Sequence, residues 1–265
     1  FTDALAAFAA APLAGADSAR AVLRLSLLDW CAVALAGQQE PVAQVLRALA
    51  QEEGGAPQAH AIGMAARVPA RMAALVNGTL SHALDYDDTH FAHIGHPSVA
   101  VIPAALAIGE RIGASGTALQ EAALVGVEAS VRVGVWLGRG HYQAGFHQTA
   151  TAGAFGAGLA AGRLLGLSAA QFADVIGLLS TRASGLKSQF GTMGKPFNAG
   201  IAAANGVEAA LLVSKGFDPR RAGLEDAQGF GPTHHGAGDI PALNGLGETS
   251  LFEQVSPQFH ACCHG

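Results

Sequence analysis

Ionisable side chains gather in one stretch of this sequence, between Asn77 and Glu110. The stretch holds four of the eleven histidines and three aspartates: His82, His90, His93, His96, Asp85, Asp87 and Asp88. Charged residues make up only 13% of the chain, so this gathering is unusual for the sequence. Imidazole and carboxyl groups withdrawn from water are common agents of proton transfer. The stretch therefore predicts acid–base chemistry.

A structural role competes with this prediction for part of the cluster. Aspartates in a polar loop can cap a neighbouring helix, and this is the role we expect for Asp87 and Asp88. His82 follows a helical pattern and is expected to pack on its helix as a structural residue. These three residues are therefore left out of the predicted catalytic set.

A metal site is a second alternative. His90, His93 and His96 are spaced three residues apart and, with a neighbouring aspartate, could bind zinc or iron. On a helix, residues at this spacing do not stay on one face, and Pro97 follows the third histidine directly. Both features weigh against a shared ligand site. The cysteines and histidines of residues 260–264 are too closely spaced for the usual Cys-x2-Cys site. We therefore expect no metal.

The composition argues against several classes of protein. A net charge of −5 without a basic run argues against nucleic-acid binding. The longest weakly charged apolar run, Thr149 to Leu167, contains Arg163, so no membrane span is expected. Three cysteines do not make a disulfide framework, and the cytoplasm is the expected compartment. Hydrolase and nucleotide-binding motifs are absent.

A chain that begins with Phe1 is expected to be a fragment or a processed form.

The ionisable groups have to be positioned by helices. Half of the residues are hydrophobic, and strand-forming residues gather nowhere. Apolar periodicity, proline starts and glycine stops predict helices at residues 17–37, 41–53, 69–84, 98–113, 117–138, 150–165, 168–181 and 201–216. Two Gly-rich loops, 138–149 and 183–200, carry His141, His147, Lys187 and Lys195. No strand alternates with these helices, so we predict an all-α fold.

Several details of these helices are also predicted. Caps are expected from Asp17 or Ser18, from Thr117 with Gln120, and from Ser168 with Gln171. Pro103 is expected to kink its helix rather than end it. Residues 256–265 are the only stretch that resembles a strand.

Four segments, in this order, resemble the MmgE/PrpD family. They are LDYDDTHFAHIGHPSVAVIPAALAIGE, GFHQTATAGAFGAGLAAGRLLGL, GKPFNAGIAAANGVEAALL and FHACCHG. Family members include 2-methylcitrate dehydratase, cis-aconitate decarboxylase and iminodisuccinate epimerase. The resemblance implies a large helical domain, here residues 1–255, and a homodimer. It also implies a smaller α+β lid, whose connection would begin at residues 256–265 and which this chain lacks.

The resemblance also implies site residues. The family's first motif aligns its aspartate, threonine and histidine with Asp85, Thr89 and His96. Its Gly-Phe-His histidine matches His147, and its Lys-Pro lysine matches Lys195. The chain departs from the family in three places. One extra residue lies between the threonine and the histidine of the first motif, Asn198 stands where many members have histidine, and Gln258 stands where a lysine is common.

These residues suggest one kind of chemistry. Dehydration, decarboxylation and epimerisation of a polycarboxylate all pass through a carbanion or enolate beside a carboxylate. We expect His96 or His147 to move the proton, Asp85 to fix the imidazole tautomer, and Lys195 to hold carboxylate oxygens. Additional substrate contacts are expected from Thr89, Arg182, Lys187 and His260.

The leading hypothesis is a cofactor-free lyase of the dehydratase type that acts on a small anionic polycarboxylate. Three alternatives stay open. The first is an epimerase of a dicarboxylate such as iminodisuccinate. The second is a metal-dependent enzyme that uses His90, His93 and His96. The third is a helical scaffold without activity.

Overall fold

A computed structural model describes residues 1–13 and 15–256 of the chain. Every secondary-structure element in that part is a helix. The α-helices are α1 (Thr2–Ala10), α2 (Asp17–Gly37), α3 (Pro41–Glu53), α4 (Ala70–Ser81), α5 (Ser98–Ile112), α6 (Gly116–Gln143), α7 (Gln148–Leu164), α8 (Ala169–Leu179), α9 (Gly194–Ser214) and α10 (Phe230–Thr233). Four short 3-10 helices join them: η1 (Lys187–Gln189), η2 (Arg221–Gly223), η3 (Ile240–Leu243) and η4 (Leu251–Gln254). Only isolated β-bridges occur among the described residues, so the all-α prediction is confirmed.

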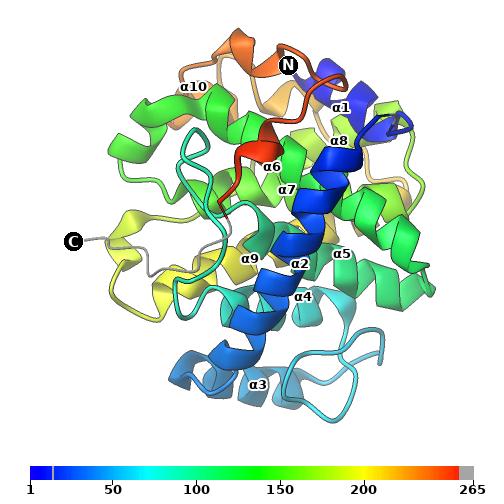
Figure 1. Ribbon diagram of the computed structural model, residues 1–265, viewed down its shortest axis with the longest axis vertical. Helices are drawn as coiled ribbons and strands as arrows, with labels where there is room; N and C mark the ends of the chain where they lie inside the picture. The colour runs from blue at the N-terminus through cyan, green and yellow to red at the C-terminus, as the bar shows by residue number, and fades with distance from the viewer. Residues whose placement is uncertain (14, 257–265) are drawn as a thin grey trace.

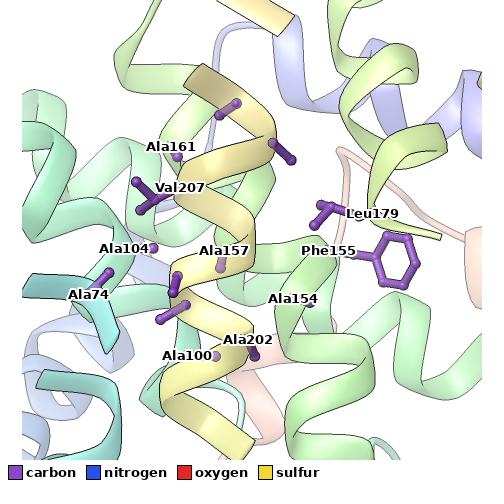
Figure 2. Close-up of a cluster of buried hydrophobic side chains, with 14 of the residues drawn as sticks. Ala74, Ala100, Ala104, Ala154, Phe155, Ala157, Ala161, Leu179, Ala202 and Val207 are labelled. Atoms are coloured by element: carbon purple, nitrogen blue, oxygen red, sulfur yellow. The ribbon is translucent and has the colours of Figure 1, made fainter. Parts of the chain in front are cut away.

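Helix α7 lies at the centre of the molecule, where it packs against α5, α6 and α9. Helix α4 packs against α5 and α9, while α2 crosses the face that is turned toward the viewer in Figure 1. Figure 2 shows that the meeting surfaces are lined mainly by alanine: Ala74 of α4, Ala100 and Ala104 of α5, Ala157 and Ala161 of α7, and Ala202 of α9. Small side chains let the helix axes come close, which explains the Ala-rich composition.

The closest approach between α7 and α9 depends on Gly206. A Cβ atom placed on Gly206 would lie 2.5 Å from the Cβ of Ala157 and 2.5 Å from the backbone nitrogen of Gly158. Backbone atoms cannot relieve such a clash by a change of rotamer, as a side chain can. Any larger residue must therefore push the two helices apart.

Gly206→Ala is therefore expected to lower the free energy of unfolding by about 1–3 kcal/mol, the usual cost of overpacking a core. Urea denaturation measures the change. Gly116→Ala is the matched control, because a Cβ atom there has nothing within 4 Å and Gly116 lies in the first turn of α6. The control should leave stability unchanged or raise it by up to about 1 kcal/mol. Equal losses in both variants would contradict the packing argument.

Two helices extend further than predicted. Helix α6 continues to Gln143 across a kink at Gly138, whose φ is 71°, so much of the predicted loop 138–149 is helical. Helix α9 begins at Gly194, so Lys195 lies in its first turn rather than in a loop. Proline is tolerated in that turn because its missing N–H would have no helical partner there, and Pro196 therefore does not delay the helix.

Of the three N-terminal caps predicted for α2, α6 and α8, one is confirmed. Ser168 and Gln171 form the predicted capping box of α8. Helix α6 is instead capped by Ser115, whose side chain accepts a hydrogen bond from the N–H of Ala118, and Ala16 occupies the N-cap position of α2. Helix α5 runs through Pro103 as predicted, and α1 was not predicted at all.

Helix α9 is long and apolar enough, by length and composition, to cross a membrane. In this fold 67% of its most apolar window is buried inside the protein, and the helix packs against α4 and α7. Its apolar residues therefore have partners within the helical core.

A buried ion pair on α6 holds the end of the described chain. The Nε–H of Arg132 donates to Glu128 over 2.6 Å, and both side chains are buried. Arg132 also donates to the carbonyls of Ala242, Asn244 and Thr249, while Glu128 accepts from the Ser250 hydroxyl and the N–H groups of Leu251 and Phe252. The chain beyond is thereby directed to Thr89, which forms an antiparallel bridge with Ser256.

Candidate active site

The loop between α4 and α5 carries most of the ionisable cluster, and Asp88 anchors it to α5. Its carboxylate accepts hydrogen bonds from the N–H of Ser98 at 3.3 Å and from the Ser98 hydroxyl at 2.5 Å. Asp88 therefore caps α5, as predicted. The loop turns sharply at Asp85 and Ile94, which have φ angles of 59° and 56°.

His90 bonds to backbone groups, whereas both ring nitrogens of His93 are buried without a hydrogen-bond partner among the described residues. The Nε2–H of His90 donates to the carbonyl of Leu251 at 2.8 Å, and its Nδ1 accepts from the N–H of His93 at 3.1 Å. Both ring nitrogens of His90 are thus occupied by backbone groups. The His93 ring is buried against Gly134. The metal alternative built on His90, His93 and His96 has no support from this arrangement.

Asp87 lies between two histidines. Both of its carboxylate oxygens are 3.0 Å from Nδ1 of His82, and Oδ2 is 3.0 Å from Nδ1 of His96. The carboxylate is 2% exposed and the two rings are buried, with their centroids 4.8 Å apart. The prediction that Asp87 caps a helix is therefore wrong. His82 also lies at the centre of the cluster instead of standing apart from it.

Asp85 and Lys195 lie on the other side of His96. Nε2 of His96 is 3.4 Å from Oδ1 of Asp85, and the same oxygen forms an ion pair with the ammonium group of Lys195. The Asp85 side chain is 29% exposed and that of Lys195 is 13% exposed, although Oδ1 of Asp85 is itself buried. Asp87 contacts Nδ1 of His96 and Asp85 faces Nε2, so each ring nitrogen has an oxygen neighbour.

His147 joins the cluster from the N-terminus of α7. Its ring stacks on His82, with centroids 5.5 Å apart and an interplanar angle of 23°, and meets the edge of Phe190 at 4.9 Å. The side-chain N–H2 of Asn198 donates to Nδ1 of His147 and to the carbonyl of Leu186, each at 3.3 Å. With Nδ1 accepting, the neutral ring carries its hydrogen on Nε2.

The surroundings set different charges on these histidines. Burial opposes a charge on His96, but the carboxylates of Asp87 and Asp85 outweigh it and raise its pKa to about 9. Burial lowers the pKa of His147 well below its usual value, and the nearby His82, His96 and Lys195 lower it further. Burial also lowers the pKa of His82 despite its contact with Asp87.

Burial alone would raise the pKa of Asp87, but the facing imidazoles of His82 and His96 lower it far below its usual range. At neutral pH the cluster therefore contains an imidazolium at His96 and a carboxylate at Asp87. The rings of His82 and His147 are neutral.

Four of these residues could be considered as metal ligands by distance. One ligand atom from each of His82, Asp85, Asp87 and His96 lies within 4.8 Å of the others. The two carboxylates already face two cations, the imidazolium of His96 and the ammonium of Lys195. The four residues and Lys195 thus form a network of facing charged and hydrogen-bonding groups.

The side-chain contacts of Arg182 and Lys187 lie outside this cluster. Arg182 forms an ion pair with Glu208, which lies about 20 Å along α9 from Lys195 at a helical rise of about 1.5 Å per residue. The ammonium group of Lys187 lies 3.8 Å above the ring centroid of Tyr142. Thr89 is buried and pairs with Ser256 through backbone hydrogen bonds. His260 lies outside the described residues.

Comparisons with known proteins show the family to which this chain belongs. The family model of the MmgE/PrpD N-terminal domain matches residues 3–241. Cis-aconitate decarboxylase of Aspergillus terreus is 32% identical over 212 residues, which are 77% of this chain and 43% of that protein. The human cis-aconitate decarboxylase is 32% identical over 170 residues, or 62% of this chain and 35% of that protein. The chain thus spans less than half the length of these two relatives. Because the family match covers most of its residues, the chain belongs to the MmgE/PrpD family.

Proposed function

We propose that this chain carries the acid–base site of a lyase that acts on a small polycarboxylate without a cofactor. The observation that carries the proposal is the pairing of a cationic His96 with the ammonium group of Lys195 around Asp85. Two adjacent cations with one partly exposed carboxylate suit an anionic substrate, which can take over the contact that Asp85 makes with Lys195.

In this proposal each group has a separate task. Lys195 binds a substrate carboxylate and faces the negative charge that develops beside it in the transition state. His96 donates the proton on Nε2, since its Nδ1 is held by Asp87. His147 offers the Nε2–H of a neutral imidazole, which can stabilise enolate oxygen without carrying a full charge.

These charges favour decarboxylation within the lyase class. When the bond between carbon and the departing carboxylate breaks, carbon dioxide leaves and the electron pair stays on the substrate as a carbanion or enolate. That species needs a proton donor and no base, and His96 is such a donor. The names of the relatives, cis-aconitate decarboxylases, point to the same reaction.

Dehydration and epimerisation remain the second candidate, and dehydration is the reaction that the sequence alone favoured. Both need a base for the α-proton. His147 is neutral and stands nearest to that role, but its Nδ1 already accepts a hydrogen bond from Asn198. Use of His147 as a base would require the Asn198 amide to turn.

NMR in deuterated water tests these reactions together. The complete protein is incubated with citrate-like and aspartate-like acids, including cis-aconitate. Decarboxylation is expected to release carbon dioxide and to place one deuteron on the product. Loss of water would identify a dehydratase, and exchange of an α-hydrogen without loss would identify an epimerase. If every acid remained unchanged, the scaffold hypothesis would replace the proposal.

The remaining expectations also stand as proposals. We propose a homodimer, a helical domain formed by residues 1–255, and a connection toward a lid beginning at residues 256–265. Light scattering of the complete protein measures the dimer directly. We also propose that the protein is located in the cytoplasm.

A further inference from the structure

We propose that Asp87 is the positioning residue of this site, a carboxylate that holds His82 and His96 as one unit and aims Nε2 of His96 at the reacting carbon. The inference rests on the proposed function, in which His96 supplies the proton. It assigns a role to a residue that the sequence had suggested to be a helix cap.

The geometry around Asp87 carries this inference. Its carboxylate oxygens lie 3.0 Å from Nδ1 of both His82 and His96, and its backbone carbonyl also lies 3.0 Å from Nδ1 of His96. An imidazole held from one side by two oxygens of a single residue has little freedom to rotate. Its Nε2 then points away from Asp87 toward Asp85 and Lys195, where the site is partly exposed.

Asp87 also decides which of the two rings carries charge. One carboxylate balances one cation, and two imidazolium rings with centroids 4.8 Å apart would repel each other. His96 has a second carboxylate, Asp85, at its Nε2, whereas Nε2 of His82 is buried without a partner among the described residues. The proton is therefore retained on His96, while His82 donates its single N–H to Asp87.

Charged groups on the surrounding elements act on His96 as well. Asp85 and Asp87 face it from its own loop, and Lys195 of α9 and His82 at the end of α4 oppose its charge. Asp29 of α2 also interacts with His96, and burial together with Asp88 and Asp87 raises the pKa of Asp29 to about 7.

His147 at the start of α7 and His93 of the same loop also interact with His96, and burial lowers the pKa of both rings well below its usual value. Among all these groups, Asp87 is the one that bonds to Nδ1 of His96.

Asp87→Asn tests the inference through the titration of His96. NMR of histidine labelled with 15N follows the ring in the complete protein, and His96→Gln identifies its signals. In the wild type the His96 pKa is about 9. Without the Asp87 carboxylate, burial and Lys195 should dominate and bring that pKa below the ordinary value of about 6.5. The basic limb of the activity profile should move to lower pH by the same amount.

Asp88→Asn is the matched control. Asp88 is the adjacent aspartate and equally buried, but its carboxylate bonds to Ser98 and not to a histidine. In Asp88→Asn the pKa of His96 should stay at its wild-type value. If it also stayed there in Asp87→Asn, Asp87 would not be the positioning residue, and this conclusion would hold for any reaction of the enzyme.

The wild-type protein provides a second test if Asp87→Asn does not fold. At pH 7.5, the 15N shifts should identify His96 as an imidazolium and His82 as a neutral ring with its hydrogen on Nδ1. A neutral His96, or a charged His82, would overturn the inference. Neither NMR measurement depends on turnover, so a failure here is distinguishable from a failure of the proposed lyase activity.

Discussion

Replacement of His96 by glutamine is expected to reduce turnover by a factor of about 10²–10⁴, the usual contribution of a general acid. Glutamine keeps an amide that can hydrogen-bond but has no proton to give at neutral pH. The wild type should lose activity as pH rises through about 9, because the donor is the protonated form of His96. His96→Gln should lack this limb in the profile of kcat/KM.

His90→Gln serves as the control for this prediction. His90 belongs to the same loop and is also buried, but its ring bonds to backbone groups and takes no part in the cluster. Turnover in His90→Gln should stay near that of the wild type. A wild-type rate and an unaltered basic limb in His96→Gln would remove His96 from the mechanism.

Replacement of Lys195 by methionine is expected to lower kcat by a factor of about 10²–10³, comparable to the loss of one donor to a developing oxyanion. Methionine has a similar length and fills the same space without charge. KM should rise as well, because Lys195 is proposed to bind the substrate carboxylate. Steady-state kinetics of the complete protein separate the two effects.

The charge of Lys195 also acts on its neighbour, and this gives a second measurement. Its ammonium group lowers the pKa of His96. Without it, the pKa of His96 should rise above about 9, and the basic limb of the remaining activity should move to higher pH. Lys215→Met is the control, since Lys215 follows the far end of α9. An unchanged kcat and KM in Lys195→Met would exclude the proposed binding role.

The sequence was sufficient to predict most of the helices, although not α1, and to select four residues that the structure brings together. Periodic apolar residues, prolines and glycines act locally, so the helix positions could be read from the chain. Asp85, His96, His147 and Lys195 were selected because they match family motifs. The structure brings these four residues together, although they lie on three separate segments.

The contacts of Arg182 could not be predicted from the sequence, because they depend on how the turn after α8 lies against α9. Arg182 was expected to contact the substrate, but it pairs with Glu208 in the C-terminal half of α9. Asn198 was noted as a departure from the family, and only the structure shows that it holds the ring of His147.

The roles of the two adjacent aspartates were decided by tertiary structure alone. Asp87 and Asp88 are the same residue type in the same loop, and nothing in the sequence separates them. The turn at Asp85 and the packing of α4 against α5 direct Asp88 to Ser98 and Asp87 inward between His82 and His96. The charge on His96 and the neutrality of His147 follow from burial and from neighbours distant in sequence. The sequence by itself thus determined the helical class and the chemical groups. The fold decided their partners and charges, because burial and distance exist only in three dimensions.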